Sequence, residues 1–89
     1  MALSESQRNQ IARYKVQIQE CRKSIENESL KKKEKSEYYS NQIKNAKDSN
    51  TKRNYREYKI SFVNNSNNYI AGIKREIEKL KEYIIQINK

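Results

Sequence analysis

The sequence contains no histidine, proline or tryptophan, and it has one glycine and one cysteine in 89 residues. Without histidine, and with Cys21 as its single thiol, the chain lacks the ligand set of a zinc site and the residues of Ser-His and Cys-His nucleophilic centres. Turn-rich β folds and disordered linkers both use glycine and proline, so the composition disfavours both. We therefore expect no enzyme, no metal and no cofactor, and ask instead what the protein binds.

Long hydrophobic runs are missing as well. Hydrophobic residues make up 34% of the chain and charged residues 35%, too little apolar material for a layered globular core at this length. The longest strictly apolar stretch near the end is Ile84–Ile85, far short of a membrane span. Residues 1–10 show no secretory signal pattern, and one unpaired cysteine fits a reducing cytosol. The expected location is cytoplasmic, with export beside a partner by a non-Sec route left open.

What the sequence does contain is a helical repeat. Apolar residues recur in two stretches at alternating steps of three and four. A mean spacing of 3.5 produces a narrow apolar stripe, which is typical of helices packed as a coiled coil. The predicted seam comprises Ile11, Tyr14, Ile18, Cys21 and Ile25 in the first stretch and Ile73, Ile77, Leu80, Ile84 and Ile87 in the second.

The two stretches mirror each other about Ser49. Facing members, such as Ile11 and Ile87, have residue numbers that sum to 98. Residues 46–51, Ala-Lys-Asp-Ser-Asn-Thr, concentrate turn-forming and helix-capping side chains at the same point. We predict an all-α fold, an antiparallel two-helix coiled-coil hairpin forming one domain over residues 1–89. Its expected parts are a helix over 4–46, a turn over 47–50 and a helix over 51–88.

Local signals support both helix starts, whereas the middle of the hairpin is polar. Residues 4–7, Ser-Glu-Ser-Gln, match a capping box, and any of residues 48–51 could cap the second helix. Extending the mirror beyond Ile25 gives a polar waist, in which the asparagine-rich segment 64–68 has poor helix propensity. The expected facing residues are Ser29, Lys32 and Ser36 in the first helix and Tyr69, Ser66 and Phe62 in the second.

Several apolar residues lie off the seam and cannot all face inward in a two-helix hairpin. Two long helices that share one narrow stripe are only marginally stable, because ordering the chain costs about as much as the stripe contributes. We therefore predict that helices of a partner protein, or of a second copy, complete a three- or four-helix bundle. The candidate partner face comprises Val16, Leu30, Ile60, Val63, Ile70 and Ile85.

Positive charge is concentrated near the predicted turn. The chain has a net charge of +9, and the candidate basic tip comprises Lys44, Lys47, Lys52, Arg53, Arg56 and Lys59. Basic residues beside tyrosines are suited to nucleic acid, since cations neutralise phosphates and rings stack on bases. No nucleic-acid-binding motif is present, however, and lysine-rich helices more often form a solvated face or meet an acidic protein. We favour the latter readings and keep nucleic acid as an alternative.

Two segments carry a resemblance to a known family. Ile11–Ile25 (IARYKVQIQECRKSI) and Asn68–Leu80 (NYIAGIKREIEKL) resemble the small helical-hairpin helper proteins associated with LXG toxins of Gram-positive type VII secretion. The resemblance implies a hairpin that packs beside a second small helper and the helical N-terminal domain of a toxin. That complex would then be presented to a secretion ATPase.

The chain departs from related WXG-type hairpins at two places. It has Asp48-Ser49-Asn50 where a Trp-x-Gly turn is expected, and Tyr83 is followed four residues later by Ile87 and not by an acid. No export-signal residue can therefore be transferred to this sequence. The chain also resembles coiled-coil modules attached to bacterial TIR-type defence effectors, which would imply a self-assembling or oligomerising role.

Overall fold

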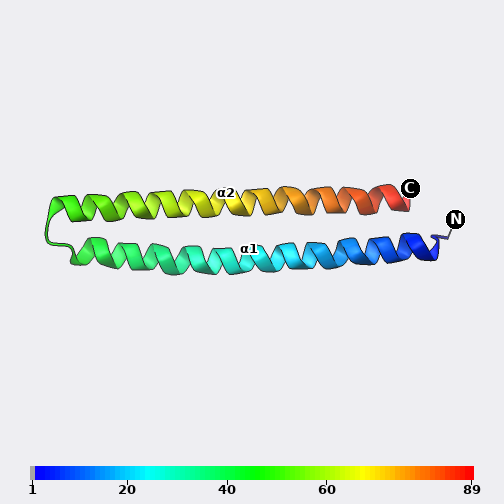
Figure 1. The fold of residues 1–89 in the computed structure, drawn as a ribbon, viewed down its shortest axis with the longest axis horizontal. Coiled ribbons are helices and arrows are strands. Elements are labelled where there is room, and N and C mark those ends of the chain that lie inside the picture. The colour runs from blue at the N-terminus through cyan, green and yellow to red at the C-terminus, as the bar shows by residue number, and fades with distance from the viewer. Residues whose placement is uncertain (1) are drawn as a thin grey trace.

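The protein is a hairpin of two long helices. The computed structural model describes residues 2–89 and contains α1 (Glu5–Asn45) and α2 (Ser49–Asn88). The helices run antiparallel, with both termini at one end and the turn at the other (Figure 1). The molecule measures 70 × 15 × 12 Å. The predicted all-α hairpin is confirmed.

Side-chain caps define where each helix begins. The Ser4 hydroxyl accepts a hydrogen bond from the Gln7 N–H at 3.1 Å, and Gln7 Oε1 accepts one from the Ser4 N–H at 2.8 Å. At the turn, Asp48 accepts hydrogen bonds from the Thr51 N–H at 2.7 Å and the Thr51 hydroxyl at 3.0 Å. Because Asp48 takes the cap position, α2 begins at Ser49, two residues earlier than expected.

The best-packed part of the seam lies in the half nearest the termini. Ile18, Ile77 and Leu80 are buried together, and Leu80 is only 3% exposed. Ile11 is also buried, whereas Ile87 is half-buried at the open end. The remaining residues of the predicted seam are half-buried and pack against this cluster: Tyr14, Cys21, Ile25, Ile73 and Ile84.

One layer of the seam differs from the expected mirror. Ile70, expected on the outer partner face, is 8% exposed and lies in the seam, while Tyr69 is more than half exposed. On α1 the corresponding residue is the half-buried Glu28, and Ser29 is exposed. The seam of α1 therefore keeps its alternating steps of three and four as far as Glu28. The expected seam had two successive steps of four at Cys21–Ile25–Ser29; the observed seam has them one layer later, at Glu28–Lys32–Ser36. Such an extra step of four locally unwinds a coiled coil.

The polar waist is hydrogen-bonded across the hairpin. The Ser66 hydroxyl, 2% exposed, donates to Glu28 Oε1 at 2.7 Å. Lys32, one layer nearer to the turn than Glu28 on α1, donates through Nζ to Asn67 Oδ1 at 2.9 Å. The asparagine-rich segment 64–68 stays within α2 without a break, because these contacts anchor it to α1.

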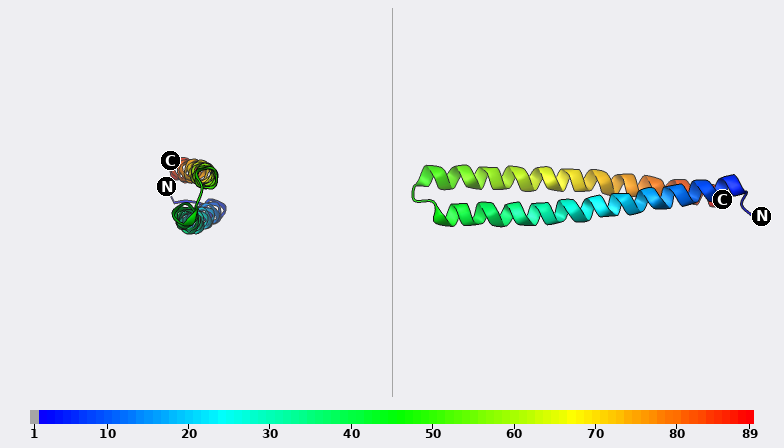
Figure 2. Two further views of the ribbon diagram at one scale, coloured as in Figure 1. Left: turned by 90° about the vertical axis from the view of Figure 1, so that its left-hand side faces the viewer. Right: turned by 60° about the horizontal axis from the view of Figure 1, so that its bottom comes forward.

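A two-helix rod leaves much of its surface uncovered. Its radius of gyration is 20.2 Å, against about 12 Å for a compact domain of this length. It exposes 7087 Å², whereas a typical globular monomer of this mass exposes about 5,500 Å². The end-on view in Figure 2 shows the two helices alone, twisting about each other with nothing over either flank of residues 2–89. Neither helix in that range offers a stretch apolar enough to cross a lipid bilayer.

Candidate protein-interaction surfaces

A row of exposed tyrosines follows one flank of α2. Tyr58, Tyr69 and Tyr83 are between 47% and 55% exposed. Tyr69 and Tyr83 directly precede the seam residues Ile70 and Ile84, and Tyr58 precedes Lys59, whose half-buried side chain continues the seam toward the turn. The three tyrosines therefore share one side of the seam, and their separations of 11 and 14 residues match those of the seam residues that follow them. We call these three residues the tyrosine row. Sequence reasoning missed it, although this matched spacing is a signal that could have revealed it.

Rings from the hairpin interior support two members of the row. Tyr83 packs against Tyr14 with ring centroids 5.5 Å apart. Tyr58 lies 6.3 Å from Tyr39 and 6.0 Å from Tyr55. These separations are typical of favourable aromatic pairs. One side of each exposed ring is therefore held in place, and the other side is free to contact a partner.

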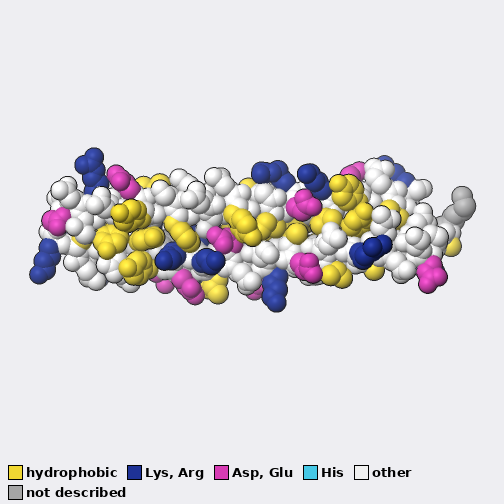
Figure 3. Space-filling view, viewed as in Figure 1, with side chains coloured by type: hydrophobic (Ala, Val, Ile, Leu, Met, Phe, Trp, Pro, Cys, Tyr) yellow, Lys and Arg dark blue, Asp and Glu magenta, His cyan; other side chains and the backbone are white. Residues whose placement is uncertain are grey.

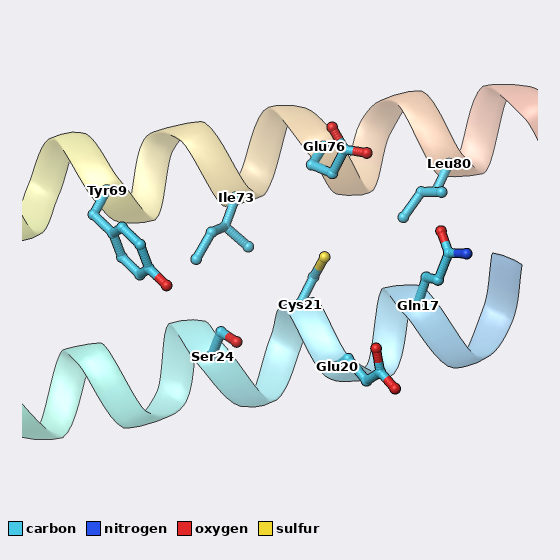
Figure 4. A pocket seen from close by; sticks show the side chains of 8 residues that line it. All are labelled: Gln17, Glu20, Cys21, Ser24, Tyr69, Ile73, Glu76 and Leu80. Atoms are coloured by element: carbon cyan, nitrogen blue, oxygen red, sulfur yellow. The ribbon is translucent and has the colours of Figure 1, made fainter.

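Tyr69 stands at one end of a shallow groove between the helices. In Figure 4, Tyr69 leans from α2 toward Ser24 of α1, and Cys21 points into the gap near Ile73. The carboxylates of Glu20 and Glu76 stand at its rim. The whole face in Figure 3 shows hydrophobic side chains along the junction of the helices, gathered most densely toward the turn. The groove thus continues an apolar strip with a polar border.

A second groove lies on the other flank of α2, near the turn. Ile60 follows the seam residue Lys59, whereas the row member Tyr58 precedes it, so Ile60 and Tyr58 lie on opposite sides of the seam. Ile60 is 60% exposed. We call this surface the turn-proximal groove. It is lined by Ile43 from α1 and by Arg56, Lys59, Ile60, Val63 and Asn64 from α2.

The structure does not bring the candidate partner face together as one surface. Val16 and Leu30 are exposed, and each lies midway between seam positions of α1, on the side away from α2. Ile85 is exposed near the open end. Ile60 and the half-buried Val63 line the turn-proximal groove. Ile70 does not belong to this face, because it is buried and continues the seam.

The basic tip retains positive charge that the hairpin itself does not neutralise. Arg53 pairs with Glu57 at 3.8 Å, and the Asp48 carboxylate caps α2. Glu57 and Asp48 are the two acidic residues between positions 44 and 59. Within residues 2–89 the other basic members of the tip have no ion-pair partner, although Lys59 donates to the Ser40 hydroxyl at 2.9 Å. The residues concerned are Lys44, Lys47, Lys52, Arg56 and Lys59.

The cap also alters the acidity of Asp48. Hydrogen bonds from the backbone N–H and the hydroxyl of Thr51 stabilise the ionised carboxylate and hold the pKa of Asp48 below its ordinary value of 3.8. The residue is fully exposed, so solvent screens this effect. Asp48 therefore remains ionised near neutral pH while its carboxylate caps the start of α2.

Comparisons with known proteins add no family to this picture. No family model, no curated protein and no solved structure matches the chain.

Proposed function

We propose that the hairpin is a non-enzymatic interaction protein that docks lengthwise against helices of another protein. The observation that carries this proposal is the tyrosine row. Tyrosine is enriched at protein interfaces, because it buries a large ring while its hydroxyl stays hydrogen-bonded. A third helix laid beside the seam would meet Tyr58, Tyr69 and Tyr83 in succession, because their spacing follows the repeat of the seam.

The balance of buried and exposed apolar side chains supports the same proposal. Among residues 2–89, five hydrophobic residues are buried, whereas eight large ones are exposed. The surface in excess of a globular monomer is about 1,600 Å², about twice the roughly 800 Å² that each partner buries in a standard protein interface. A partner helix would cover apolar surface that the rod cannot cover by itself.

The finer proposal concerns the kind of partner. The resemblance of Ile11–Ile25 and Asn68–Leu80 to the LXG-associated helpers supports a role as an accessory or targeting partner of a type VII secretion toxin. Under that proposal, the helical N-terminal domain of the toxin supplies the docked helix. A second small helper would occupy another flank of the rod.

Two other functions receive less support. For nucleic-acid binding, Tyr39 and Tyr55 near the basic tip are half-buried and pack on each other, which reduces the ring surface open to bases. For self-assembly, including an oligomerising role in a defence system, the net charge of +9 on each copy opposes association. Nucleic acid bound at the tip would also leave Tyr69 and Tyr83 of the tyrosine row uncovered.

The test is to co-express the full chain with the products of neighbouring genes and measure association by sedimentation. We expect a complex whose thermal unfolding is more cooperative than that of the isolated chain. Tyr69→Ser and Tyr83→Ser should each weaken the complex by about tenfold, as expected for interface anchors. Val16→Ser and Leu30→Ser remove exposed apolar groups from the far side of α1; they should leave a helix docked on the tyrosine row in place and weaken only a helper bound on that flank. The proposal would be contradicted by a stable, cooperatively folding monomer whose sedimentation and thermal unfolding are unchanged in the tyrosine variants.

A further inference from the structure

We propose that the turn-proximal groove is a second docking site, and that its occupant is an amphipathic helix of another protein with an apolar stripe and acidic flanks. The groove lies on the opposite side of the seam from the tyrosine row. The inference therefore goes beyond lengthwise docking on that row, and each can fail without the other.

The floor of the groove is aliphatic. Ile60 has the largest exposed fraction of the large hydrophobic residues in the described chain, 60%. Ile43 and Val63, both half-buried, flank it from the two helices. Branched aliphatic side chains of this kind receive leucine or isoleucine knobs in helical bundles. The shape and chemistry of the floor therefore fit the apolar stripe of a helix.

The charges at the rim of the groove indicate which charges the docked partner helix should carry. Arg56 is exposed and has no ion-pair partner within residues 2–89, and Lys59 contacts only the neutral Ser40 hydroxyl among side-chain acceptors. The two carboxylates within the basic tip already have partners, because Glu57 pairs with Arg53 and Asp48 caps α2. Acidic side chains flanking the incoming stripe would supply the missing counter-charges.

A second copy of the chain is a poor occupant. A symmetric dimer places the same patch of both subunits together, so Arg56 and Lys59 of one copy would approach the same residues of the other. Nucleic acid fits poorly for a different reason. The lining of the groove contains no aromatic ring on which a base could stack.

The experiment uses two synthetic three-heptad helices as probes, both with leucine in the stripe, one with glutamate and the other with lysine at the flanking positions. Each carries a fluorophore, and binding to the full-length protein is followed by anisotropy at physiological salt. We expect the glutamate probe to bind and the lysine probe to bind at least about tenfold more weakly, because the latter adds like charges at the rim.

Variants locate the site of binding. Ile60→Ser should weaken the glutamate probe by about tenfold or more, through loss of the buried aliphatic contact. Ile85→Ser, another exposed isoleucine outside the groove, is the matched control and should leave binding unchanged. Arg56→Glu should reverse the preference between probes, whereas Lys79→Glu, with the same change in net charge at an exposed position outside the groove, should not. Circular dichroism checks that every variant keeps its helicity.

Five outcomes would overturn the inference. Equal binding of both probes, or no binding of the glutamate probe, would contradict the proposal of an acidic partner helix. Binding that is lost in Tyr69→Ser and kept in Ile60→Ser would place the helix on the tyrosine row, leaving the proposed function intact. A DNA or RNA oligonucleotide that displaces the probe and whose binding ignores Ile60→Ser would assign the tip to nucleic acid. Sedimentation that shows a dimer abolished by Ile60→Ser would assign the groove to a second copy.

Discussion

The Ser66 hydroxyl of α2 donates a 2.7 Å hydrogen bond to the Glu28 carboxylate of α1. Ser66 is the buried polar residue of the described chain, at 2% exposure, and Glu28 is half-buried in the same stretch of seam. A shift in the pairing of the helices would leave both groups without partners. Polar pairs at such positions specify register in coiled coils, and we expect this pair to do the same in the part of the seam that has few apolar contacts.

Removing that hydrogen bond should reduce stability measurably. Ser66→Ala leaves Glu28 without its donor, so we expect the free energy of unfolding to fall by about 1 kcal/mol in urea titrations. Ser61→Ala, at an exposed position of the same helix, is the matched control and should be neutral or slightly stabilising, because alanine favours helix. Equal effects of the two substitutions would show that the bond contributes nothing.

Leu80 is the most deeply buried hydrophobic residue, and its truncation should be costly. Leu80→Ala removes packing against Ile18 and Ile77, and we expect a loss of about 2–3 kcal/mol, because a core one layer deep can partly relax. Urea unfolding followed by circular dichroism measures it. Leu30→Ala, at an exposed site of α1, should change stability by less than about 0.5 kcal/mol. Similar losses at both sites would mean that the two helices do not pack in this way.

Gly72 is a site where stability can be increased. It lies within α2, and an added Cβ would meet only the flexible end of Arg75, at 3.8 Å. Alanine fits there without strain and removes the entropic cost of glycine in a helix, so Gly72→Ala should stabilise the hairpin by about 0.5–1 kcal/mol. An unchanged or lower midpoint in thermal unfolding would contradict this expectation.

The cap at Asp48 predicts a dependence of stability on pH. Because hydrogen bonds from Thr51 lower its pKa in the folded state, its contribution is complete above the ordinary value of 3.8. That contribution disappears as the pH falls through the lowered folded-state pKa. Asp48→Asn keeps a capping oxygen but cannot titrate, so the difference in melting temperature between wild type and variant should shrink toward acidic pH. A difference that stays constant across that range would rule out this linkage.

The placement of Ile70 and Tyr69 shows where sequence reasoning reached its limit. The apolar repeat identified the stripes near the termini, since their isoleucines and leucine leave little choice of register. Through residues 28–36 of α1 the seam carries Glu28, Lys32 and Ser36, so no apolar pattern fixes the layer. Burial there is decided by the α2 side. Ile70 enters the seam because isoleucine gains more from burial than tyrosine, whose hydroxyl can remain in water.

The candidate sites were foreseen less completely than the fold. Off-seam apolar residues indicated surplus surface, and the charge pattern located the basic tip. Neither could show that Ile60 and Ile43 line one groove, or that the exposed tyrosines align on the opposite flank. Those groupings depend on the rotation of each helix about its axis, which packing across the seam sets.

The sequence by itself determined that the chain is helical, that it reverses near Ser49, and that its ends lie side by side, because the 3.5-residue period and the turn and cap residues act locally. Only the tertiary structure decided which carboxylates are already engaged and which apolar and basic side chains remain open to a partner. Those properties arise when two particular helix faces meet, and no single stretch of chain contains that information.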